Sequence, residues 1–120
     1  MRIRNLIRGT ILATDAGVAD TSAKRNTGLL RHKSLPRGEA LFITPCEGVH
    51  TVGMKFPIDV LFLSRQRTVV KITEAMKPWR ISLCLRAHSV LELPAGMAAE
   101  TGTLPGDQLA FETREEDASA

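Results

Sequence analysis

Short apolar runs separated by turn residues constrain the fold of this 120-residue chain more than any other feature. From residue 40 onward these runs occupy residues 40–44, 49–54, 58–63, 68–73, 89–93 and 108–112. Their length suits β-strands, and the connections between them are too short to hold crossover helices. We therefore expect a mainly β fold, a single compact antiparallel β-barrel or β-sandwich over residues 1–112.

One or two short helices should accompany the strands. Asp20, Thr21 and Ser22 can cap a helix over residues 23–31, and residues 94–102 can hold one or two turns that end at Gly102. Residues 64–67 (Ser-Arg-Gln-Arg) occupy a hairpin turn, although no Gly or Asn there supplies a positive φ. Residues 113–120 form an acidic tail that we expect to fray.

Composition excludes several classes of protein. With 43% hydrophobic and 24% charged residues, the chain is not disordered. No apolar run approaches the roughly 18 residues of a membrane span. Four Phe, one Trp and no Tyr are few rings for stacking on bases or sugars, so nucleic acid is an unlikely partner. Two cysteines make no disulfide framework and no leader peptide is evident, so we expect a cytoplasmic protein without a cofactor.

Charge is distributed unevenly along the chain. Residues 1–37 hold eight basic and two acidic residues, whereas the remainder holds eight basic and eleven acidic residues. A basic first third can serve an interaction with an anionic partner, or it can be ordinary solvated surface charge.

The densest polar cluster lies in residues 46–63, CEGVHTVGMKFPIDVLFL. On an extended strand His50 and Met54 face the same side, and Pro57 then bends the chain so that Asp59 returns toward His50 or Thr51. Asp59 interrupts the most apolar run of the chain, so its carboxylate must be paired or hydrogen-bonded.

Three interpretations of this cluster stay open. Asp59 can hold the corner at residues 55–57 through backbone N–H groups, with His50 as a core histidine. His50, Thr51, Met54 and Asp59 can instead line a small-molecule pocket with Trp79 as its wall. Cys46, His50 and Asp59 have the residue types of a nucleophile, a base and an orienting acid, although Glu47 beside Cys46 disfavours a thiolate.

A metal site is a further alternative. Cys46 and His50 are separated by three residues, and Cys84 and His88 repeat that spacing, so four zinc ligands are available. In a strand, however, residues four apart lie about 13 Å from each other, beyond the reach of one ion. Such a site would require a turn within each pair.

Four motifs of the chain resemble the uncharacterised domain-of-unknown-function family 192. They are Arg25-x-x-Gly-Leu-Leu-x-His32, Leu35-Pro-x-Gly-Glu-Ala-Leu-Phe42, Pro45-Cys-x-x-Val-His-Thr-x-Gly-Met-x-Phe-Pro-Ile-Asp-Val-x-Phe-Leu63 and Val90-Leu-Glu-Leu-Pro-Ala-Gly96. The resemblance extends from about Asn5 to Phe111, with small departures after Gly28 and in the 64–67 turn. It implies a small β-rich barrel or sandwich with no established activity, and it carries over the motif positions His50, Thr51, Met54, Pro57 and Asp59 as the site.

Three functional hypotheses follow. The first is a non-enzymatic small-ligand-binding or structural β domain that uses His50, Thr51, Met54 and Asp59. The second is a small hydrolase- or transferase-type enzyme that uses Cys46, His50 and Asp59. The third is an interaction module that binds an anionic partner through the basic N-terminal third.

Overall fold

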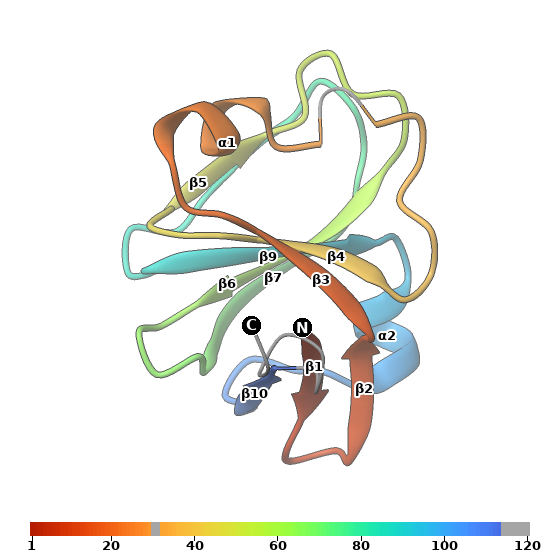
Figure 1. The fold of residues 1–120 in the computed structure, drawn as a ribbon, viewed down its shortest axis with the longest axis vertical. Coiled ribbons are helices and arrows are strands. Elements are labelled where there is room, and N and C mark those ends of the chain that lie inside the picture. Colours follow the sequence, from red (N-terminus) through yellow and green to blue (C-terminus); the bar gives the residue numbers. More distant parts are fainter. Residues whose placement is uncertain (30–31, 114–120) are drawn as a thin grey trace.

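The strands form three separate hydrogen-bonded sheets in the computed structural model, which describes residues 1–29 and 32–113 (Figure 1). The elements are β1 (Arg2–Asn5), β2 (Thr10–Ala13), β3 (Asp15–Ala19), α1 (Ser22–Thr27), β4 (Glu39–Ile43), β5 (Gly48–His50), β6 (Ile58–Leu63), β7 (Val69–Met76), β8 (Ile81–Leu83), β9 (Ser89–Pro94), α2 (Met97–Thr101) and β10 (Leu109–Glu112). The mainly β fold with two short helices is confirmed, and the sheets are not closed into a barrel.

A five-stranded sheet in the order β3-β4-β9-β6-β7 forms the centre of the molecule. Every residue of β6 is buried, and five of the six residues of β9 are buried as well. Such continuous apolar strands are typical of positions covered on both faces of a sheet. β10, β1 and β2 form a second sheet, and β5 pairs with β8 in a two-stranded ribbon.

The expected antiparallel pairing has one exception, at an edge of the central sheet. β3 and β4 are parallel, with Asp15 opposite Glu39 and Ala19 opposite Ile43. The connection between them contains α1 and is long enough for a crossover, which parallel neighbours require. The remaining pairs of this sheet are antiparallel.

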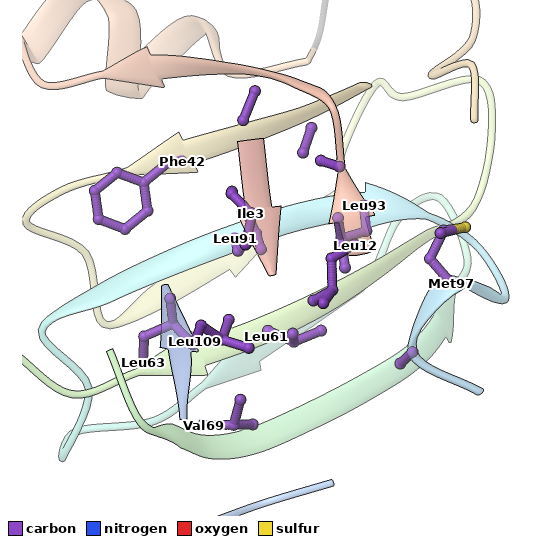
Figure 2. Packing of buried hydrophobic residues seen from close by; sticks show 14 residues of the cluster. Ile3, Leu12, Phe42, Leu61, Leu63, Val69, Leu91, Leu93, Met97 and Leu109 are labelled. Carbon is purple, nitrogen blue, oxygen red and sulfur yellow. The ribbon is translucent and has the colours of Figure 1, made fainter. Parts of the chain in front are cut away.

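Side-chain alternation along β6 and β9 divides the core into two apolar clusters. Leu61 and Leu63 of β6 and Leu91 and Leu93 of β9 pack with the β10-β1-β2 sheet, as Figure 2 shows for Ile3, Leu12 and Leu109. On the opposite face, the cluster contains Val60, Phe62, Val90 and residues near α1 and β5. Each face of the central sheet is therefore covered by a different part of the chain.

Both predicted helices are present, and glycine sets where each one ends. The side chain of Thr21 caps α1 by accepting a hydrogen bond from the Lys24 N–H at 3.2 Å. The helix was predicted to extend to residue 31, but α1 ends at Thr27 because Gly28 takes a φ of +47°. Residues 30–31 of the predicted helix lie outside the described residues. α2 ends at Gly102, with a φ of +68°, as predicted.

The predicted hairpin turn between β6 and β7 uses an arginine where a glycine is usual. Arg67 has a φ of +65°, and its N–H donates to the Ser64 carbonyl at 2.9 Å. Its guanidinium lies 4.2 Å from the Phe111 ring centroid and 5.4 Å from that of Phe42. These cation–π contacts offset part of the cost of the left-handed backbone.

Ion pairs join the basic N-terminal third to acidic residues of the last third. Arg2 and Arg4 contact Glu112 at 2.9 Å and 3.2 Å, and Arg8 contacts Asp107 at 3.0 Å. Arg37 pairs with Glu100. The two regions of opposite charge therefore neutralise each other in part within the fold. From residue 114 onward, the predicted frayed tail lies outside the described residues.

No helix in residues 1–29 and 32–113 combines the length and the apolar character needed to cross a membrane.

Candidate functional site

A cavity of about 430 Å³ lies between the end of α1, the strand β5 and the outer face of β4 and β9. Arg25 of α1 and Gly28, the residue after this helix, line the cavity on one side. Cys46, His50 and Met54 line it from β5 and its flanking loops, and Glu92 lines it from β9. Its volume falls within the range of small-molecule sites, about 300–1,000 Å³.

Glu92 is the most unusual group in the cavity wall. Its neighbours Leu91 and Leu93 point into the cluster beneath the β10-β1-β2 sheet, so alternation turns Glu92 to the opposite face. Only 4% of Glu92 is exposed, and its Oε1 has no hydrogen-bond partner among the described residues. Burial raises the pKa of this carboxyl from 4.5 to about 7.

Gly28 brings the end of α1 close to this carboxyl group. A Cβ built on Gly28 would lie 3.9 Å from Glu92 Oε1 and 3.9 Å from the Arg25 carbonyl oxygen. With a φ of +47°, the position also disfavours any residue that has a Cβ. Gly28 therefore allows the helix end to cover Glu92 without filling the space beside it.

Cys46 has the properties of a protonated thiol. Its Sγ–H donates to the Gly48 carbonyl at 3.0 Å, and its backbone N–H donates to the His88 carbonyl at 2.8 Å. Burial is the main reason that the pKa of this thiol is raised, and the nearby charge of Glu92 acts in the same direction. Thiolate chemistry at neutral pH is therefore disfavoured at this position.

Arg25 and His50 add polar groups to the cavity wall. The Arg25 guanidinium donates to the Asp20 carbonyl at 3.1 Å and to Ser22 Oγ at 3.4 Å, so the helix start holds it in place. His50 is exposed and pairs in register with Ile81 of β8. Both residues line the cavity.

Asp59 lies on the other face of the central sheet and does not line the cavity. It is fully buried, with Oδ1 accepting from the Ala75 N–H at 2.8 Å and Oδ2 accepting from the Ala98 N–H at 2.9 Å. These bonds join an irregular point of β7, where Ala75 has a φ of +47°, to the first turn of α2. The structure thus brings Cys46, His50 and Met54 together and leaves Asp59 apart from them.

Thr51 and Trp79 also lie outside the cavity wall. The buried Thr51 hydroxyl donates to the Lys77 carbonyl at 2.6 Å and accepts from the Arg80 N–H at 2.9 Å. The backbone N–H of Trp79 donates to the Thr51 carbonyl at 3.0 Å, while 65% of the residue is exposed. Thr51 therefore holds the turn that carries Trp79 at the surface.

In the part of the chain that the structure describes, no three His, Cys, Asp or Glu side chains are placed to hold a metal ion. This includes the four candidate zinc ligands Cys46, His50, Cys84 and His88. Both cysteines are free, and Cys84, which follows β8 directly, is buried in the same apolar cluster as Val60 and Phe62.

The sequence interpretation missed Glu92, Arg25 and Gly28 as parts of one site. A signal for Glu92 was present, because it interrupts an apolar strand in the same way as Asp59 does. What the sequence could not provide was the position of α1, which reaches Glu92 only through the parallel β3–β4 crossover.

Comparisons with known proteins agree with the resemblance in the motifs. The DUF192 family, described as "Uncharacterized ACR", matches residues 3–111. A UPF0127 protein of Pyrococcus furiosus is 33% identical over 111 residues, which cover 88% of this chain and 93% of that protein. A UPF0127 protein of Pyrococcus abyssi is 32% identical over 102 residues, covering 80% and 85% of the two chains.

Two solved structures share the fold. A protein of unknown function from Novosphingobium aromaticivorans matches with a TM-score of 0.79 and 23% identity, covering 92% of this chain and 82% of its own. A putative transcription regulator from Sinorhizobium meliloti matches with a TM-score of 0.80 and 23% identity, covering 91% and 89%. Together, the motifs, the family match and the two Pyrococcus relatives establish that the chain belongs to the DUF192 family of uncharacterised proteins.

Proposed function

We propose that this protein binds a small organic cation in the cavity beside Glu92, with an ammonium or guanidinium group of the ligand placed against the Glu92 carboxylate. The observation that carries the proposal is the buried Oε1 of Glu92, which has no partner among the described residues. A buried carboxyl group without a partner is costly to a fold, and such groups are concentrated at functional sites.

The electrostatics of the cavity favour a cation over a neutral ligand at the Glu92 end. Burial is the cause of the raised pKa of Glu92 in the part of the chain that the structure describes. A cationic nitrogen would supply the missing charge and the missing hydrogen bond in a desolvated setting. Arg25 and His50 would then contact a neutral or anionic group at the outer end of the ligand.

The architecture supports a site on this face. We infer a two-layer sandwich in which the β10-β1-β2 sheet covers one face of the central sheet with an apolar cluster. The other face is covered by the short α1 and the narrow β5–β8 ribbon, and the cavity lies beneath them. Of the residues predicted from the sequence, His50 and Met54 belong to this proposed site.

A series of short alkyl probes tests the proposal by isothermal titration calorimetry. Butylammonium and butylguanidinium should bind the wild-type protein, whereas butyrate, which repels Glu92, should not. Binding should be lost in Glu92→Gln, which keeps the side-chain shape but removes the charge. It should be retained in Glu74→Gln, an exposed glutamate of β7 outside the cavity.

The pH dependence identifies the ligand class. A cation binds the ionised form of Glu92, so its affinity should fall about tenfold for each pH unit below about 7 and level off above it. Equal affinity of wild-type and Glu92→Gln protein for the two cations would refute the proposal. An affinity that falls as the pH rises through 7 would instead indicate a ligand that needs the protonated carboxyl.

A further inference from the structure

Residues 77–86 form an exposed surface that is both apolar and basic, and that is separate from the cavity. Four large apolar side chains are exposed by more than half in this segment: Trp79 at 65%, Ile81 at 72%, Leu83 at 60% and Leu85 at 79%. Along β8 the usual pattern is inverted, since the polar Ser82 is buried between exposed Ile81 and Leu83. We call the apolar residues together with Lys77, Arg80 and Arg86 the β8 surface.

The backbone holds the tip of this surface in an uncommon conformation. Trp79 has a φ of +65°, a region that bulky residues rarely occupy. Thr51 maintains it by donating its hydroxyl to the Lys77 carbonyl and by accepting from the backbone N–H groups of Trp79 and Arg80. A strained, over-determined backbone that presents a tryptophan to solvent is typical of a functional position. In Figure 1 the turn between β7 and β8 lies at the opposite end of the molecule from β1, β2 and β10.

Charge distinguishes this surface from the other exposed apolar group. Residues 77–86 contain three basic and no acidic residues, and none of the three forms an ion pair with a described residue. At the far end, Leu6, Ile7 and Leu104 are also exposed, but Arg8 there is neutralised by Asp107. The β8 surface is therefore the one of the two that combines exposed apolar side chains with uncompensated positive charge.

We propose that the β8 surface docks on an anionic lipid bilayer. Trp79, Ile81, Leu83 and Leu85 would enter the boundary between headgroups and acyl chains, where aromatic and aliphatic side chains are stabilised. Lys77, Arg80 and Arg86 would contact lipid phosphates. A negatively charged membrane complements the charge of all three basic residues. Neighbouring elements add two exposed acids, Glu47 and Glu74, and one further basic residue, Lys71, so basic residues remain in excess.

The chain offers a direct probe, because Trp79 is its only tryptophan. Vesicles of phosphatidylcholine with about one-quarter phosphatidylglycerol should shift the fluorescence of the wild-type protein to shorter wavelength, and brominated acyl chains should quench it. Vesicles of phosphatidylcholine alone should produce little change. An unshifted and unquenched spectrum with anionic vesicles overturns the proposal.

Variants separate insertion from charge attraction in a co-sedimentation assay. Leu83→Ser with Leu85→Ser should weaken binding about tenfold or more, and Arg80→Gln should weaken it about fivefold. Ile7→Ser, an equally exposed apolar position at the far end, should leave binding unchanged. All these sites are exposed, so an unchanged melting temperature verifies the fold.

Two outcomes contradict the proposal. If the double leucine variant binds anionic vesicles as well as the wild type does, the contact is purely electrostatic and the apolar side chains do not insert. If vesicles are not bound and the wild-type chain associates with itself in a way that the same variant abolishes, the β8 surface is instead an interface between protein chains. Both results are independent of the cation proposed for the Glu92 cavity.

Discussion

Replacing Glu92 by glutamine should make the protein more stable at neutral and alkaline pH, because it removes an ionisation that the fold disfavours. The pKa of Glu92 is about 7 in the folded protein and has an ordinary value of 4.5. Between these values the folded state binds a proton that the unfolded chain has lost. The stability of the wild type therefore falls as the pH rises from about 4.5 to about 7 and stays lower above that range.

The size of the effect follows from the width of this interval. Each pKa unit corresponds to about 1.4 kcal/mol, so a shift from 4.5 to about 7 gives about 3 kcal/mol. An amide in the same place does not ionise and carries no such loss. The free energy of unfolding of Glu92→Gln minus that of the wild type should thus rise by about 3 kcal/mol between pH 4 and pH 8.

Urea denaturation of both proteins at intervals across this pH range measures the difference directly. All other titrating groups are common to the two proteins and cancel in the comparison. Glu74→Gln provides the matched control, since that glutamate is exposed, and its difference from the wild type should stay nearly constant. Parallel curves for wild type and Glu92→Gln would refute the assignment of Glu92 as a buried carboxyl with a raised pKa.

Three further predictions concern residues that the sequence singled out. Asp59→Asn should lower the free energy of unfolding by about 1–3 kcal/mol in urea denaturation, because one of two backbone donors, Ala75 or the buried Ala98, loses its acceptor; a change below about 0.5 kcal/mol would contradict this. Thr51→Val should lower the free energy of unfolding by about 1–3 kcal/mol in the same assay and should change the fluorescence spectrum of Trp79. An unchanged stability and spectrum would show that the turn does not depend on the hydrogen bonds of the Thr51 hydroxyl. Cys46 should react with iodoacetamide at pH 8 more slowly than a free thiol, as measured by mass spectrometry, and bound butylammonium should slow it further; rapid labelling would indicate an activated cysteine.

Hydrophobic patterning was sufficient to predict the strands that are buried on both faces. β6 has the predicted bounds of 58–63, and β9 extends one residue beyond the predicted 89–93. Gly102 ends α2 as predicted because a left-handed residue was needed there. The sequence did not predict β3 and β8. β3 is a short edge strand with Gly17 at its centre, and β8 carries its apolar residues outward, so neither strand has the pattern of a half-buried strand.

The candidate site was predicted only in part, because strand alternation separates residues that are close in sequence. Asp59 was correctly expected to need hydrogen-bond partners, but its neighbours Ile58 and Val60 point to the cavity side and Asp59 points away. Glu92 follows the same alternation along β9, but it points toward the cavity. Which face becomes a cavity depends on where α1 returns to the sheet, and local patterning carries no information on that crossover.

The most direct test of the proposed site is a ¹³C NMR titration of the Glu92 side-chain carboxyl in the folded protein, with and without butylammonium. Alone, the carboxyl should titrate near pH 7, and saturation with butylammonium should move its pKa well below that value because the cation stabilises the ionised form. A carboxyl that titrates near 4.5 without the probe, or near 7 both with and without it, would contradict the account of Glu92 as the binding group of this cavity.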